Sequence, residues 1–132
     1  MRVVDSSVVV AALTDRSDTG AWAESIVFGD RLAAPALMHF EAANVIRRLV
    51  SRGAITPFDG AAALADLTAL SVAVVPFEFV VDRSWELRHT VTMYDAAFVA
   101  AAEAFLAPLY TLDRRLAAAP GPMCPIITPP GA

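Results

Sequence analysis

Four acidic residues are the side chains of this sequence best suited to chemistry: Asp5, Glu41, Asp95 and Asp113. Four carboxylates brought to one place would repel one another and raise one another's pKa unless a cation neutralised them. Carboxylate oxygens suit hard divalent cations, so Mg²⁺, with Mn²⁺ as the alternative, is the expected cofactor. Such an ion lowers the pKa of a bound water and stabilises a leaving oxygen. The set therefore predicts metal-dependent cleavage of phosphodiesters without a nucleophilic side chain.

Taken one at a time, these residues also have simpler interpretations. The three aspartates stand where an acid commonly caps a helix or sits in its first turn. Glu41 lies within a predicted helix, where no cap is needed, and an acid there can pair with Arg48 or hydrogen-bond Asn44 one turn on. These alternatives stay open for each residue alone, whereas the four together favour a metal site.

The elements that position the acids alternate between strand and helix patterns. We expect strands at 2–5, 31–34, 71–75 and 109–112, the third of them buried, and a short edge strand at 126–127 between prolines. We expect helices at 8–13, 18–28, 36–52, 56–70, 79–91, 92–107 and 113–119, with Pro35 opening the third. This alternation predicts an α/β domain with a mostly parallel central sheet flanked by helices on both faces. Asp5 and Asp113 each close a strand, so both belong at the edge where such sheets bind ligands.

Composition limits the class of protein. A chain of 132 residues that is 57% hydrophobic predicts one domain over 1–132, with a Pro-rich C-terminal segment from 120 to 132. The single Cys124 allows no internal disulfide and fits a reducing compartment. We see neither a signal peptide nor an apolar run long enough for a membrane span, so we expect a soluble, cytoplasmic protein with no membrane partner. All 10 basic residues are Arg, against 14 acids, so nucleic-acid contacts must come from local Arg clusters.

Four short motifs follow one another in a specific order and spacing: VVDSS at 3–7, EAANVIR at 41–47, YDAAFVAAA at 94–102 and TLDRRL at 111–116. In this combination, over nearly the whole chain, the sequence resembles the PIN-domain ribonucleases, specifically the VapC-type toxins of bacterial toxin–antitoxin pairs. The resemblance implies that the four acids bind the metal, with Asp5 and Asp95 as direct ligands. It implies supporting hydrogen bonds from Ser6 and Thr111, and an Asn44 that orients Glu41.

The same resemblance implies a partner set. VapC-type toxins cut RNA endonucleolytically, pair as homodimers and are silenced by a cognate antitoxin that wraps around them and reaches into the acidic pocket. Four arginines are compatible with contacts to RNA phosphates: Arg47, Arg48, Arg114 and Arg115.

Two alternatives remain beside this interpretation. One is a non-catalytic α/β module that binds protein or nucleic acid and uses its acids as caps. The other is a PIN nuclease of RNA processing or DNA flaps. A phosphoacceptor receiver domain is excluded because that family uses a pocket Lys and this chain has none. The chain also has no Gly-rich phosphate loop, which excludes the common nucleotide-binding folds.

Overall fold

The computed structural model describes residues 1–131, in which five strands alternate with seven helices. All strand pairs are parallel, in the order β3-β2-β1-β4-β5. The strands are β1 (Arg2–Val4), β2 (Leu32–Pro35), β3 (Val72–Val75), β4 (Leu109–Tyr110) and β5 (Ile126–Ile127). The predicted α/β class is confirmed, and the sheet is wholly rather than mostly parallel.

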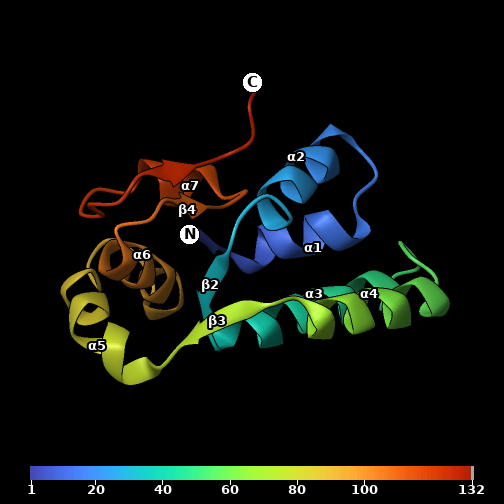
Figure 1. Cartoon of the computed structure of the whole chain (residues 1–132), viewed down its shortest axis with the longest axis horizontal. Helices are drawn as coiled ribbons and strands as arrows, with labels where there is room; N and C mark the ends of the chain where they lie inside the picture. Colours follow the sequence, from blue (N-terminus) through green and yellow to red (C-terminus); the bar gives the residue numbers. More distant parts are fainter. Residues whose placement is uncertain (132) are drawn as a thin grey trace.

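Seven helices connect and flank these strands. They are α1 (Ser6–Thr14), α2 (Asp18–Val27), α3 (Leu37–Ser51), α4 (Pro57–Ala69), α5 (Phe77–Glu86), α6 (Met93–Phe105) and α7 (Arg114–Ala118). In Figure 1, α5 and α6 pack together on one side of β2, and α1 to α4 lie on the other side. Within residues 1–131, no helix is long and apolar enough to cross a membrane.

The core forms where apolar strands meet an alanine-rich helix. Val3 and Val4 of β1 are completely buried, and every residue from 96 to 102 in α6 is buried as well. Most residues of that run are alanines, so α6 can lie close against β1, β2 and β4. Thr92 fixes the start of α6, because its Oγ1 accepts a hydrogen bond from the backbone N–H three residues on.

The strand order places a switch point at β1. From β1 the chain moves outward to β2 and β3, then returns on the other side of β1 to form β4 and β5. In open parallel sheets, ligands bind beyond the carboxyl ends of the strands at such a point. Asp5 follows β1 directly and Thr111 follows β4 directly, so both lie at this position.

Several predicted element bounds differ from those observed. The strand at 71–75 is not buried throughout: β3 ends the sheet, and Ala73 and Val74 are exposed because only β2 pairs with it, whereas Val75 is buried. Pro35 does not open α3 but ends β2, opposite Val75, and the helix begins at Leu37. The helix predicted at 79–91 begins and ends earlier, at 77–86.

The C-terminal segment is held by the predicted short strand and by one carboxylate. β5 pairs with β4, which confirms the expected edge strand at 126–127. Glu103 accepts hydrogen bonds from Arg83 Nε at 2.7 Å and from the Met123 backbone N–H at 2.8 Å. Burial alone would raise the pKa of Glu103, but these hydrogen bonds and the Arg83 charge lower it overall.

Candidate active site

Asp5 lies at the centre of the hydrogen bonds at this sheet edge. Its Oδ2 accepts from Thr111 Oγ1 at 2.7 Å and from Ser7 Oγ at 2.9 Å, and its Oδ1 accepts from Ser6 Oγ at 3.3 Å. Although Asp5 occupies the N-cap position of α1, its side chain makes no capping hydrogen bond. The capping interpretation is therefore wrong for Asp5, whose carboxylate is held by hydroxyl groups.

Two hydroxyl residues connect the ends of β1 and β4. Thr111 is completely buried, donates to Asp5 and accepts from the Asp113 backbone N–H at 3.0 Å. Ser7 donates to Asp5 and accepts from the Leu112 N–H at 3.1 Å. Sequence reasoning selected Ser6 and Thr111 but missed Ser7. Its signal was its place in the Asp-Ser-Ser run, where a second hydroxyl stands within reach of the carboxylate.

Glu41 joins Asp5 through Ser6. Its Oε1 lies 3.4 Å from Ser6 Oγ, the same hydroxyl that reaches Asp5. Burial raises the pKa of Glu41, repulsion from Asp5 and Asp95 raises it further, and the Ser6 hydrogen bond partly opposes both. Glu41 thus lies close enough to Asp5 and Asp95 for their charges to act on it.

The simpler interpretation of Glu41 and the expected role of Asn44 both fail in the structure. The carboxylate makes no ion pair with Arg48 among residues 1–131. No hydrogen bond joins Asn44 to Glu41 among residues 1–131, and Asn44 Oδ1 accepts from Arg47 Nε at 2.9 Å. Arg47 stands three residues on along α3, so this local helical pair involves the amide oxygen of Asn44.

Asp95 and Asp113 approach the same edge from α6 and α7. Burial raises the pKa of Asp95, and repulsion from Asp5 and Asp113 adds to it. Asp113 is exposed, and its Oδ1 accepts from the backbone N–H groups of Arg115 and Leu116 at 2.9 and 3.3 Å. The capping interpretation is therefore confirmed for Asp113, and these two bonds involve only one of its carboxylate oxygens.

The donor set fits a hard divalent cation. Four carboxylates share one sheet edge, and the pKa values of Glu41 and Asp95 are raised by burial first and by the charges of the neighbouring acids second. No three acidic, histidine or cysteine groups within 1–131 already converge on one point at ligand distance. The acids are close enough to repel one another, and side-chain rotation would be needed to bring them onto one ion.

The four expected RNA-contacting arginines have different surroundings. Arg114 donates to Thr128 Oγ1 at 3.3 Å and to the Pro129 carbonyl at 3.2 Å, so the C-terminal segment occupies it. Arg47 is bound to Asn44. Arg48 and Arg115 are exposed and make no ion pair in the described part of the chain. Arg48 stands two turns after Glu41 on the same face of α3.

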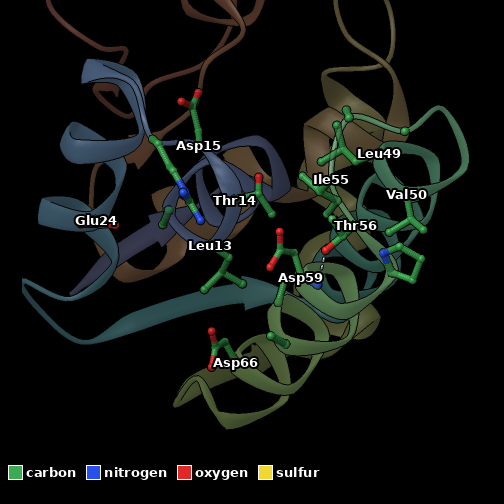
Figure 2. A pocket seen from close by; sticks show the side chains of 17 residues that line it. Leu13, Thr14, Asp15, Glu24, Leu49, Val50, Ile55, Thr56, Asp59 and Asp66 are labelled. Atoms are coloured by element: carbon green, nitrogen blue, oxygen red, sulfur yellow. Dashed lines mark hydrogen bonds between the residues drawn. The ribbon is translucent and has the colours of Figure 1, made fainter.

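A separate cleft lies between the first four helices and does not include the four acids. It has a volume of about 1050 Å³ and is lined by residues of α1, α2, α4 and the end of α3. Figure 2 shows Leu13 and Thr14 of α1 facing Asp59 of α4 across it. Four carboxylates line it, from Asp15, Glu24, Asp59 and Asp66, against the single charge of Arg16.

Comparison with known proteins decides the family. The PIN domain model matches residues 2–122. The chain belongs to the PIN-domain family. This PIN protein is 36% identical over 130 residues to Ribonuclease VapC9 of Mycobacterium tuberculosis strain H37Rv, covering 98% of this chain and 99% of that protein. It is 38% identical over 125 residues to Ribonuclease VapC1 of the same strain, covering 94% of each chain.

A solved structure shares the PIN fold at low sequence identity. It is VapBC2 from Rickettsia felis bound to a DNA fragment from its promoter, with a TM-score of 0.63 and 12% identity. The match covers 96% of this PIN chain and 97% of the other. The recognition of a VapC-type PIN domain from its sequence motifs is thus confirmed.

Proposed function

We propose that this PIN protein is a metal-dependent endoribonuclease and the toxin of a VapBC toxin–antitoxin pair. The observation that carries the proposal is the Asp5 carboxylate, held by three hydroxyl groups among three further acids at the switch point of the sheet. Relatives named as VapC ribonucleases, 36–38% identical over nearly the full chain, support the same activity.

Asp5, Glu41, Asp95 and Asp113 are the residues that would hold Mg²⁺ or Mn²⁺. When bound, such an ion supplies a water of lowered pKa and stabilises charge on the leaving oxygen. Ser7 and Thr111 fix the orientation of Asp5, leaving its Oδ1 only the longer Ser6 contact. Glu41 accepts from Ser6 through Oε1 alone, so its second oxygen is the one left for the cation.

Arginine side chains near the acids supply phosphate contacts in this proposal. Arg48 extends from the Glu41 face of α3, and Arg115 follows the acid that caps α7. Both are exposed and carry full positive charges, which suits contacts to RNA phosphates. Arg47 donates to Asn44 through Nε only, which leaves both of its Nη groups unpaired within residues 1–131, whereas both Nη groups of Arg114 donate to the C-terminal segment.

The deciding experiment is an RNA-cleavage assay on the purified, antitoxin-free protein in Mg²⁺, Mn²⁺ or EDTA. Asp5→Asn keeps the shape of the side chain and removes its charge, and we expect it to abolish cleavage. Asp18→Asn is the matched control, because Asp18 is an exposed acid in the first turn of α2. Cleavage in EDTA, or undiminished cleavage by Asp5→Asn, would contradict the proposal. Absence of both cleavage and calorimetric metal binding would favour the non-catalytic module.

The cognate antitoxin, in our proposal, uses the cleft between α1, α2 and α4. Apolar side chains line the cleft, including Leu13, Leu49 and Ile55, and carboxylates outnumber its arginine four to one. This suits an amphipathic segment with basic residues. Asp59→Lys with Asp66→Lys should weaken the complex with the cognate antitoxin in a pull-down assay, and should leave RNA cleavage unchanged.

A homodimer is the assembly we propose, through the free edge of β3. Val74 on this strand is 50% exposed, and Phe77 and Phe79 at the start of α5 are 66% and 75% exposed. An unpaired edge strand beside two exposed rings leaves backbone hydrogen-bonding groups and apolar surface in water, which favours association with a second copy. Sedimentation velocity tests this, and Phe79→Glu should shift the protein to a monomer.

A further inference from the structure

The C-terminal segment holds the guanidinium group of Arg114 from two sides. Arg114 Nη1 donates to Thr128 Oγ1 at 3.3 Å, and Nη2 donates to the Pro129 carbonyl at 3.2 Å. Both acceptors come directly after β5, a strand that also contacts α7, the helix that begins at Arg114. The PIN domain model matches only as far as residue 122, so these two acceptors lie outside the part of the chain that defines the family.

The direction of the strands places this contact at the same edge of the sheet as the acids. β5 runs parallel to β4, and β4 runs parallel to β1, so the carboxyl ends of all three lie at one edge. Thr128 follows β5 there, as Asp5 follows β1. Neighbouring strands are about 4.8 Å apart, which puts the end of β5 roughly 10 Å from the end of β1. An arginine held there can contact a phosphate next to one that lies at the acids.

The segment is attached firmly at its start and weakly at its end. Near its start, the Gly121 carbonyl accepts from Arg83 at 3.0 Å, and the Met123 N–H donates to Glu103 at 2.8 Å. Beyond Ile127, the two bonds from Arg114 are the only hydrogen bonds that hold the segment within residues 1–131. The prolines at 129 and 130 have no N–H with which to extend the strand pairing. The end of the segment can therefore detach while its start stays in place.

The charges show what would compete for Arg114. The segment from 120 to 131 contains no charged residue, so the guanidinium group is bound to neutral oxygen atoms. Hydrogen bonds in which the acceptor also carries a charge are shorter and stronger. A phosphate group is such an acceptor, and Arg114 is exposed. RNA can thus displace the segment, but its binding is weakened by the cost of breaking the existing contact.

We infer that the end of the C-terminal segment is an autoinhibitory contact, in which Thr128 and Pro129 occupy Arg114 and weaken RNA binding until a phosphate displaces them. The inference rests on the proposed ribonuclease function. It adds a regulatory device that lies outside the four acids and makes Arg114 a phosphate-binding residue only after release.

The test measures binding of a fluorescein-labelled uridine 10-mer in Mg²⁺ by fluorescence anisotropy, with Asp5→Asn in every protein so that the strand is not cut. Thr128→Val removes the hydroxyl acceptor and keeps the shape of the side chain, and it should tighten binding about 2- to 5-fold. It should also steepen the slope of log Kd against log salt concentration by up to about 0.7, the value for one added phosphate contact. Thr128→Ser is the matched control, because it keeps the hydroxyl and should bind like the parent.

A double-mutant cycle shows whether the gain comes from Arg114. Arg114→Ala should weaken binding more in the Thr128→Val protein than in the parent, and with Arg114→Ala present Thr128→Val should no longer tighten binding. Arg115→Ala is the control for this cycle: Arg115 is an exposed neighbour whose side chain makes no hydrogen bond to the segment within residues 1–131. It should weaken binding by the same factor with and without Thr128→Val.

Three results would overturn the inference. Unchanged binding by Thr128→Val would show that the contact does not restrain Arg114. Weaker binding by Thr128→Val would show that the segment holds Arg114 in place for RNA. A gain that persists with Arg114→Ala would show that the valine acts by another route.

The two proposals can fail separately. With Asp5 restored, Thr128→Val should raise kcat/KM for RNA cleavage by about the factor by which it tightens binding. If the wild type cuts RNA in Mg²⁺ and the Thr128 variants behave like it, the autoinhibitory contact is wrong and the nuclease assignment stands. If no protein of the series binds or cuts RNA, both proposals are wrong.

Discussion

Thr111→Val tests how the Asp5 carboxylate is held. Valine has nearly the shape of threonine, so the change removes a hydroxyl from a completely buried position without leaving a cavity. The hydrogen bond lost at Asp5 Oδ2, 2.7 Å long, involves a charged group and contributes about 1.5–3 kcal/mol. The bond accepted from the Asp113 N–H, 3.0 Å long, contributes about 1 kcal/mol.

The expected loss of unfolding free energy is therefore about 2.5–4 kcal/mol, which lowers Tm by roughly 9–14 °C for a domain of this size. Urea denaturation and thermal denaturation in EDTA measure it. Because Asp5 also loses a bond that orients it, cleavage in Mg²⁺ should fall about 10- to 100-fold. Thr111→Ser is the matched control: it keeps the hydroxyl, loses one buried methyl group and should keep most of the activity.

Two results would refute this reasoning. If the unfolding free energy of Thr111→Val lies within about 0.5 kcal/mol of the wild-type value and the variant cuts RNA at full rate, the hydroxyl does not hold Asp5. If Thr111→Ser loses as much stability and activity as Thr111→Val, the side chain acts through packing and not through its hydrogen bonds.

Three further predictions concern the acid cluster and the helix packing. Asp95→Asn should raise Tm in EDTA, because it removes charge repulsion from a partly buried site. Added Mg²⁺ should raise the Tm of this variant less than that of the wild type. A lower Tm of the variant in EDTA would contradict the repulsion. In EDTA, the stability advantage of Glu41→Gln over the wild type should grow as pH rises above the ordinary glutamate range, because the native wild type binds more protons there than the unfolded chain does. Urea denaturation across pH checks this, and a constant difference would show that Glu41 has no raised pKa. Gly20→Ala should cost about 1–3 kcal/mol because its new Cβ would collide with the Asp15 carbonyl, whereas Ala21→Ser on the exposed side of α2 should change little by thermal denaturation.

From the sequence, the position of the site in the fold could be predicted better than the hydrogen-bond partners of its individual side chains. Asp5 and Asp113 were expected at one sheet edge because each closes a parallel strand, and the structure connects them through Thr111. This prediction needs only strand direction, which the alternation of helices and strands determines. Capping was equally plausible for both acids from the sequence, and only their hydrogen bonds separate Asp113, which caps, from Asp5, which does not.

Other features depend on contacts between distant segments and could not be predicted. The Val-Ala-Val-Val run of β3 looks like a central strand, but its position at the end of the sheet follows from where the whole chain returns. Arg114 appeared free beside Asp113, yet the C-terminal segment folds back onto it. Asn44 had two possible partners on α3, Glu41 and Arg47, each one turn away from it, and the structure shows its Oδ1 accepting from Arg47.

The bond between Thr111 and Asp5 joins residues 106 positions apart, and this affects how the protein is made. A growing chain leaves the ribosome from its N-terminus, so Asp5 emerges long before the residues that hold its carboxylate. Strand β1 also lacks its β4 neighbour until then. The proposed nuclease centre is therefore assembled only late in synthesis, so the chain has no completed site during most of the translation of its own message.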